Sequence, residues 1–518
     1  MSALPTEIEV QVSVSWDGSG LFTGDYDDVT EDVAVSPGIT IDEGRDGTRA
    51  LAPPKISATD FELHNEDRTY SQESPASPVY QRVLTGRPVR VSALHGEDVE
   101  YRADRLYRAD GYYRGRTTYR LATGRIDDIS QTTALGAQRV RLANLAAAEM
   151  LIDKRISCGL RENFRTDQIF TTVLDIAGWP ANKRSIGIGD TVLLYWWMDE
   201  RRPWDVMLEL LAAEGPGAIY IDGDGVIHFE GRNYRTITDR SATSQASFSD
   251  LQPTADALWF TALNYDPGFK NIINRATYKT TRRVVQTNTK VWEYGDTLTL
   301  SADQVMTILA RSSDPLQNVS TPTDGIDYTV SAGSATVTIP PDTNGTVVFV
   351  TITAGASGAT IEGVTSNGIQ LRGAPITVVS ETTIQSSTDA SASIANYGTR
   401  THEVQGWPEI AGPTAEAVCN SWVNRYMAQR PQVTVVLRNA DGDHVHQQLR
   451  RQVSDRITLT ETNTGLASEV WVEAKRTTIA GAGARMIQTE LVCEMATNLS
   501  GAVWDESLWD DSEAVWGE

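Results

Sequence analysis

The segment covering residues 61–91 restricts the fold of this chain more than any other. It reads FELHNEDRTYSQESPASPVYQRVLTGRPVRV: a strand, a polar turn, an irregular Ser/Pro loop, and a second strand in which Val89 and Val91 alternate with a polar residue. Gly86 fits a tight turn, and Pro88 can lie only at the start or the edge of a strand. The segment presents no catalytic side chain. We therefore interpret it as a specific connection between two strands of a β-barrel.

The remainder of the chain also favours short strands joined by turns. Residues 7–16 alternate apolar and polar side chains, as a half-buried strand does. Glycine, threonine and β-branched residues are abundant, and long helical patterns are rare. The length of 518 residues is sufficient for three or four domains.

The charge balance restricts the kinds of partner that the chain can have. Lys and Arg number 45 against 68 Asp and Glu, which gives a net charge of −23. Tight binding of nucleic acid needs clustered cations, so this balance argues against it and suits a surface that DNA passes without sticking. No apolar stretch reaches the ~20 residues of a membrane span, and residues 1–10 lack the order of a signal peptide.

Three helices interrupt the strands. Residues 167–177 place apolar side chains on one face before Gly178, residues 204–211 repeat the pattern before Gly215, and residues 415–427 do so before Pro431. Residues 218–230 read as a hairpin. The cysteines, Cys158, Cys419 and Cys493, are odd in number and far apart, which indicates buried free thiols and a reducing compartment.

Candidate metal and sugar sites are weak. The sequence Asp222-Gly223-Asp224-Gly225 resembles a calcium loop, but Asn233 stands where a further acidic ligand is needed, so a type I′ hairpin turn is the better interpretation.

Asp443, His444 and His446 could offer metal ligands, but zinc needs three or four supported ligands and no other histidine stands at ligand spacing, which favours a solvated loop. Trp196 and Trp197 are adjacent in a strand, so one ring should point inward. No hydrolase or protease motif occurs. The sequence therefore predicts no enzyme, no cofactor and no metal.

The 61–91 segment resembles the N-terminal barrel of tail-hub proteins, usually labelled minor tail proteins, of long-tailed, siphovirus-type phages that infect actinobacteria. Those proteins carry L-x-N-x-D-x-R-Y-S, a Ser-Pro loop and L-x-x-G-R-P-V-R-V. Thr69 stands where the family has Arg, and a GRIDDI strand at residues 124–129 completes the similarity. The matching residues are Leu63, Asn65, Asp67, Tyr70, Ser71, Ser77, Pro78, Leu84, Gly86, Arg87, Pro88, Val89, Arg90 and Val91.

The resemblance implies a mainly β fold with α+β inserts: two tail-tube-like β-barrel domains, an α/β insert and a β-sandwich insert. Later matches to the family are looser. The expected domains are an N-terminal barrel at 1–157 with a Tyr/Arg hairpin at 98–120, an α/β insert at 158–244, a second barrel at 245–295 and 391–497 with helix 415–427, a sandwich at 296–390, and an acidic Trp-rich arm at 498–518.

One internal similarity supports duplicated barrels. Residues 87–93, 119–130 and 138–145 are three strands in the same order and with similar spacing as residues 456–462, 469–479 and 485–494. Three chains would then supply six barrels, which matches a six-fold tube with a three-fold hub. The trimer itself is implied by the family and is not visible in the residues.

Two segments are candidate partner-binding sites. The hairpin at 98–120 carries six arginines in an acidic protein, and Tyr and Arg are enriched at binding hot spots, although a plain surface hairpin is the alternative. The terminal arm repeats a Trp-acid-acid-Ser pattern without Lys or Arg, and either docks on a neighbour or is a frayed end. The candidate residues are Tyr101, Arg102, Arg105, Tyr107, Arg108, Tyr112, Tyr113, Arg114, Arg116, Trp504, Trp509 and Trp516.

The function that the resemblance implies is that of a structural hub subunit in a phage tail tip or baseplate. It would continue the tail tube as a homotrimeric ring, let viral DNA pass without specific binding, and contact the distal tail protein, the tape-measure protein and other tail-tip proteins. Its location would be the virion, after assembly in the host cytoplasm. The alternative is a receptor- or carbohydrate-binding tail protein that uses the Thr-rich region 296–387. A tail-associated hydrolase is a third reading.

Overall fold

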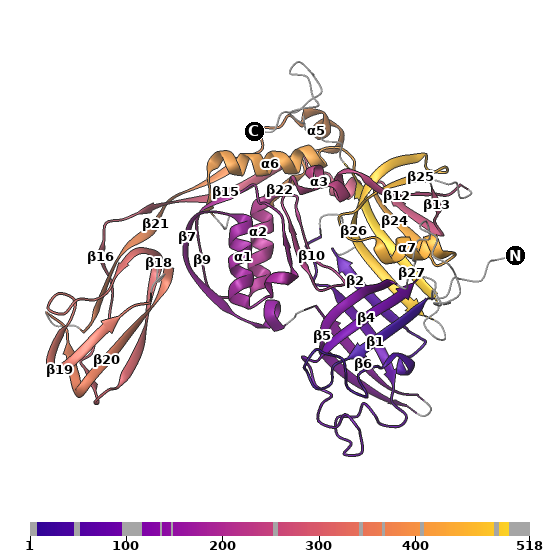
Figure 1. The fold of residues 1–518 in the computed structure, drawn as a ribbon. Coiled ribbons are helices and arrows are strands. Elements are labelled where there is room, and N and C mark those ends of the chain that lie inside the picture. Colours follow the sequence, from indigo (N-terminus) through magenta and orange to yellow (C-terminus); the bar gives the residue numbers. More distant parts are fainter. Residues whose placement is uncertain are drawn as a thin grey trace, which may run out of the picture.

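The computed structural model describes residues 8–45, 52–95, 117–134, 137–146, 149–251, 257–340, 345–364, 368–404, 409–480 and 486–496. Its fold is mainly β with helices between the strands, which confirms the predicted class. Figure 1 shows two neighbouring groups of strands, a helical module beside them and an arm that projects away from the body.

The first six strands form an antiparallel unit, which we call the N unit. Its spatial order is β1-β4-β5-β6-β3-β2. Alternation builds its core, because Val10, Val12 and Val14 of β1 are buried while the residues between them are more exposed. The strands are β1 (Glu9–Val14), β2 (Ile39–Gly44), β3 (Ala58–His64), β4 (Pro88–His95), β5 (Thr117–Ala134) and β6 (Ala137–Leu145).

Six strands from residue 244 onward form the C unit, in the order β12-β25-β26-β27-β24-β14. Numbered along the chain within each unit, both orders read 1-4-5-6-3-2. One direction differs, because β1 is antiparallel to β4 whereas β12 is parallel to β25. The strands are β12 (Ser244–Ser249), β14 (Ala262–Asp266), β24 (Gln432–Arg438), β25 (Arg456–Glu461), β26 (Leu466–Ala480) and β27 (Met486–Met495), with β13 (Leu258–Trp259) beside β12.

No sheet of the described residues closes into a barrel, so the barrels predicted from the sequence are wrong in this respect. Closure of the N unit would need β1 to pair with β2. Instead β2 pairs with β26 and joins the two units into one 13-stranded sheet. The hydrogen bonds that would close a barrel are thus used to connect the units.

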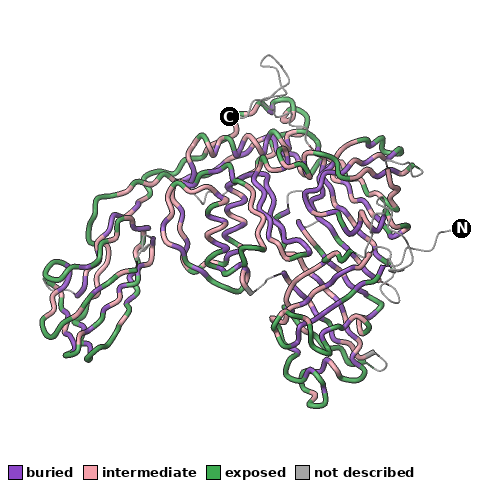
Figure 2. The backbone as a smooth tube through the Cα atoms, in the orientation of Figure 1, coloured by how far each residue is buried: buried purple, intermediate pink, exposed green. Residues whose placement is uncertain are grey.

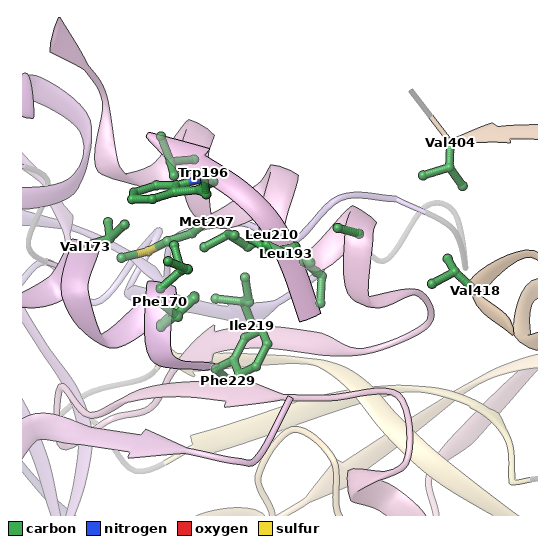
Figure 3. Packing of buried hydrophobic residues seen from close by; sticks show 14 of the residues in the cluster. Phe170, Val173, Leu193, Trp196, Met207, Leu210, Ile219, Phe229, Val404 and Val418 are labelled. Carbon is green, nitrogen blue, oxygen red and sulfur yellow. The ribbon is translucent and has the colours of Figure 1, made fainter. Parts of the chain in front are cut away.

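A helical module follows the N unit, and its core also includes residues from later in the chain, such as Val404 and Val418 (Figure 3). Phe170 and Val173 of one helix and Met207 of the next pack against Trp196 and Phe229 from strands. Gly178 ends the first helix in the left-handed conformation. The elements are β7 (Ile156–Arg165), α1 (Thr166–Ala177), β8 (Arg184–Ile186), β9 (Val192–Arg201), α2 (Pro203–Glu214), β10 (Ala218–Ile221), β11 (Ile227–Glu230), α3 (Tyr234–Ile237) and α4 (Asp239–Ala242).

The projecting arm begins with a long two-stranded ribbon of β15 and β21 (Figure 1). Its strands are linked into one sheet, the part beyond the ribbon has a separate core, and many residues of the arm are exposed (Figure 2). The strands are β15 (Arg275–Val285), β16 (Thr289–Glu293), β17 (Leu298–Leu300), β18 (Val305–Ser320), β19 (Thr329–Thr338), β20 (Gly345–Glu362), β21 (Gln370–Gln385) and β22 (Thr401–Val404). The short helix α5 (Ser391–Tyr397) lies between β21 and β22.

Two helices brace the second half of the chain. The first, α6 (Gly412–Tyr426), follows the short β23 (Glu409–Ile410) and buries Val418, Cys419 and Tyr426, the stripe expected from the sequence. The second, α7 (Gly442–Arg450), packs on β24 and β27 of the C unit and on β4 and β5 of the N unit. Val445 and Leu449 of α7 belong to the N-unit core, so this helix connects both units.

Candidate assembly interface

The Asn65 amide organises the loop that carried the family resemblance. The side chain is fully buried, accepts a hydrogen bond from the backbone N–H of Tyr70 at 2.8 Å, and donates one to Ser71 Oγ at 2.9 Å. The Tyr70 hydroxyl in turn donates to Asp32. Thr69, the departure from the family pattern, donates its hydroxyl to Asp67 at 2.5 Å. The motif therefore stabilises the loop between β3 and β4.

Gly86 and Arg87 end this loop with a hydrogen-bond pair that recurs in the C unit. The Gly86 N–H donates to the Ile126 carbonyl at 2.7 Å, and the Ile126 N–H donates to the Arg87 carbonyl at 2.9 Å. Gly86 has a φ of 79°, a left-handed conformation that glycine adopts without strain.

In the C unit the Ser454 N–H donates to Val472 at 2.7 Å and the Val472 N–H donates to Asp455 at 2.9 Å. Ser454 also has a positive φ, of 71°. The two loops end in the same geometry with different sequences.

The registers of the two units repeat residue by residue. Residues 58–64 of β3 pair with residues 145–139 of β6, and residues 432–438 of β24 pair with residues 494–488 of β27. The pairs Pro88–Arg125 and Arg456–Trp471 stand at the same end of β4–β5 and β25–β26.

Each unit has a bulge at the same place. In β5 it lies between Ile126 and Asp128, and in β26 between Val472 and Ala474. A bulge is a specific local feature rather than a general property of sheets. The internal similarity expected from the sequence therefore corresponds to a repeated strand order, register and bulge.

The two units meet where β2 runs antiparallel to β26, from Ile39 opposite Ile479 to Gly44 opposite Ala474. We call this pairing the internal join. Gly44 has a φ of 88°, and a Cβ atom there would lie 2.5 Å from the Glu473 carbonyl oxygen. Only glycine allows the backbones to approach so closely.

Charged residues of the internal join are partly shielded from water. Glu43 stands opposite Lys475, whose Nζ donates to the Arg451 carbonyl at 2.9 Å. Burial raises the pKa of Glu43 to about 7, Lys475 opposes the shift, and Asp222 adds to it. Burial likewise lowers the pKa of Lys475. Because burial disfavours both charges, this pair is not what makes the join stable.

Glu473, the bulged residue of β26, is the centre of a buried ionic cluster. Arg235 of α3 donates to both carboxylate oxygens, Arg45 lies 3.4 Å away and Arg425 of α6 lies 3.5 Å away. Burial alone would raise the pKa of Glu473, but the guanidinium groups of Arg235 and Arg45 outweigh it and hold the pKa far below its usual value. We call these four residues the Glu473 cluster.

The Glu473 cluster connects four parts of the chain. Arg45 follows β2 of the N unit, Arg235 belongs to the helical module, Arg425 belongs to α6 and Glu473 to the C unit. Glu494 extends it, because this carboxylate accepts from Arg425 at 3.2 Å and lies 2.5 Å from Arg430. The local sequence does not show which residues pair in this cluster. The charged residues within the apolar run EVWVEAKR indicate only that some charges are buried and need partners.

The candidate metal residues have structural roles. His444 lies on α7, buried, with its Nδ1 2.8 Å from Asp441 and its Nε2 2.9 Å from the Trp259 carbonyl oxygen. The predicted solvated loop is therefore wrong, because a buried imidazole is satisfied within the core. Within the described ranges, no three His, Cys, Asp or Glu side chains are arranged to hold a metal ion.

The other sequence-based expectations have mixed outcomes. Residues 222–225 do connect β10 to β11, but only Gly225 has a positive φ, so the turn is not type I′. Trp196 is buried, as expected for one of the pair, and the Arg283 guanidinium lies 5.1 Å from the Trp197 ring. Cys158, Cys419 and Cys493 are buried and form no disulfide.

A cavity of about 1080 Å³ lies between α2, α6, β15 and β22. Its walls include Lys279, His402 and Trp422, and the rings of His402 and Trp422 are 4.6 Å apart. Burial lowers the pKa of His402. Among the helices of the described residues, none has the length and apolar character needed to cross a membrane.

The twelve candidate partner-binding residues lie outside the described residues. They are Tyr101, Arg102, Arg105, Tyr107, Arg108, Tyr112, Tyr113, Arg114, Arg116, Trp504, Trp509 and Trp516. Their role as docking residues stays a prediction.

No protein-family model matches this chain, and no curated protein matches it. Solved structures with a similar overall shape include the tail protein from Neisseria meningitidis MC58 (10% identity, TM-score 0.48, covering 95% of this chain and 97% of that chain). Others are the prophage MuSo2 43 kDa tail protein from Shewanella oneidensis (12%, 0.45, 93% and 98%) and prophage tail protein gp18 from Listeria monocytogenes EGD-e (9%, 0.41, 95% and 95%). At these identities and TM-scores the similarity shows no function for this chain.

Proposed function

We propose that this chain is a structural subunit of a phage tail tip, a hub that assembles with copies of itself into a ring continuing the tail tube. The observation that carries the proposal is the internal join, in which two units of the same strand order pair edge to edge within one chain. A chain that already joins two such units is built for repetition of the same contact. The buried Asn65 motif supports the family resemblance from which the hub role is taken.

The proposed ring contains three chains and therefore six units, and its channel lets viral DNA pass. The net charge of −23 favours passage without retention, since phosphates and acidic side chains repel each other. The domain division expected from the sequence is kept, with open units in place of barrels. The proposed neighbours are the distal tail protein and the tape-measure protein, the proposed location is the virion, and the proposed role involves no catalysis.

The mass of the purified protein and a low-resolution image test this proposal. We expect a particle of three times the chain mass of 56.7 kDa, with three-fold symmetry and a central hole. A single-chain mass at every concentration, both for the protein alone and with tail extracts, would contradict the ring.

We further propose that the arm at residues 498–518 docks on a neighbouring tail protein or on a second copy. Three tryptophans on an acidic segment expose more apolar surface than a free tail tolerates, which supports docking. Deletion of residues 503–518 is expected to reduce incorporation into tail tips by at least tenfold. The matched variant retains the acidic residues and replaces Trp504, Trp509 and Trp516 with Ala. Normal incorporation of both variants would contradict docking.

A further inference from the structure

One stretch of β5 has a free edge in the described part of the chain. β4 covers β5 from Thr117 to Arg125, and beyond the bulge residues 128–134 pair only with β6. Ser130, Gln131, Thr132 and Thr133 are exposed. Long exposed strand edges pair readily with other chains, and proteins normally protect them with charges or covers. No charged residue follows Asp128 in this stretch, and no strand of the described residues pairs with its edge, although the Gln131 amide lies 3.3 Å from Ser71 Oγ.

The equivalent stretch of β26 is covered. With the bulges and hairpin ends aligned, Asp128 corresponds to Ala474 and Ala134 to Ala480. In the C unit this stretch pairs with β2 in the internal join, and Thr477 and Ile479 are buried. The same edge is thus filled in one unit and open in the other.

The equivalent of β2 also has a free outer edge. In the C unit β14 occupies its place, since Asp266 pairs with Gln432 as Asp42 pairs with Ala58. In both strands a glycine in the left-handed conformation follows two residues after this aspartate. Gly268, with a φ of 78°, follows Asp266, and Gly44, with a φ of 88°, follows Asp42. Within the described residues, β14 pairs with β24 alone.

We propose that β14 of one copy pairs antiparallel with residues 128–134 of β5 in a second copy, in the register of the internal join. This inference rests on the proposed function and specifies the contact between copies. In this register Asn264 lies opposite Thr132, just as Thr40 lies opposite Thr478 in the internal join. Asp42 opposite Arg476 translates into Asp266 opposite Ser130, which brings no like charges together. Pro267 stands where Glu43 does and lacks an N–H, so the pairing ends at Asp266.

The contact is heterologous, because one edge of a chain meets a different edge of its neighbour. Each chain carries both edges, so the contact repeats head to tail and closes when the rotation between copies permits. The internal join and the contact between copies then alternate around the ring. Every unit has one neighbour in its own chain and one in another.

A disulfide between copies tests the pairing. The Arg45 N–H donates to the Glu473 carbonyl at 3.2 Å, so these two residues form a hydrogen-bonded pair. Hydrogen-bonded and non-hydrogen-bonded pairs alternate along an antiparallel ladder, which makes Thr40 opposite Thr478 a non-hydrogen-bonded pair. Side chains are closest in such pairs. The equivalent pair between copies is Asn264 and Thr132. Two single variants, Thr132→Cys and Asn264→Cys, are co-expressed, so that a disulfide between the two new cysteines can form only between two chains. Because the native cysteines are buried, they interfere little.

We expect mild oxidation to give covalent two-chain products that a reductant reverses. The matched control co-expresses Thr133→Cys with Asn264→Cys, because adjacent residues point to opposite faces and this pair should give at least fivefold less product. Equal cross-linking of both pairs would overturn the register. A three-chain mass without cross-linking by either pair would overturn the strand pairing and leave the proposed function standing. A single-chain mass throughout would overturn both.

Discussion

Replacement of Glu473 with Gln is expected to destabilise the fold by about 3–5 kcal/mol, the cost of removing one partner from a buried ion pair. The variant leaves the guanidinium groups of Arg45, Arg235 and Arg425 without their shared carboxylate in a place closed to water. We expect a large fall in the midpoint of thermal unfolding, measured by circular dichroism, and a lower soluble yield.

The matched control is Glu62→Gln, on strand β3. Glu62 pairs with Arg139 at 2.9 Å, but both side chains are partly exposed, and such surface pairs contribute roughly 0–1 kcal/mol. Equal effects of the two substitutions would show that the Glu473 cluster is not a major source of stability.

The same variant predicts a difference in acid sensitivity. The folded-state pKa of Glu473 lies below the value of about 4.3 for an unfolded glutamate, so its stabilising effect is full above that pH and lost as the pH falls toward the folded value. The difference between the unfolding midpoints of the original protein and Glu473→Gln should therefore begin to shrink as the pH falls below about 4.3, and should be smaller at pH 3 than at pH 5. Parallel curves over this range would contradict the assignment.

Replacement of Gln131 with Pro is expected to convert the ring into single chains and leave the fold intact. The Glu473 carbonyl points toward β2 in the internal join. Because backbone groups alternate along a strand, the N–H and carbonyl groups of Lys475, Thr477 and Ile479 point toward β2 as well. By equivalence, Gln131 directs its backbone N–H to the free edge of β5. Proline removes that donor and blocks the edge, without removing a hydrogen bond between β5 and β6.

The control for this prediction is Gln131→Ala, which also removes the 3.3 Å contact from the Gln131 side chain to Ser71. We expect the alanine variant to retain the ring mass and the proline variant to lose it, with unfolding midpoints within a few degrees of each other. Light scattering measures the mass. A proline variant that still forms the full ring would rule out this edge as the contact between copies.

Local patterns predicted much of the fold. The apolar spacing of residues 167–177 and 415–427 placed two helices that the structure contains as α1 and α6. Three strand ranges in each half predicted the repeated order of the two units. These features depend on neighbouring residues, whose periodicity is visible in one sequence.

Long-range contacts could not be predicted in the same way. The pairing of β2 with β26 joins residues more than 400 positions apart, and no local pattern distinguishes it from closure of a barrel. Arg235 and Glu473 are also remote in sequence, so their contact was invisible. For the same reason His444 gave no sign that the Trp259 carbonyl would satisfy its Nε2.

The Glu473 cluster has a consequence for how such an assembly would come apart. Its four charged side chains fasten the seam inside each chain, whereas the corresponding bulge residue of the N unit, Asp127, is exposed. In a ring where the internal join alternates with the contact between copies, strong and weak contacts would therefore alternate as well. Any widening of its channel would begin where two molecules touch, and each molecule would swing outward as a rigid pair of units.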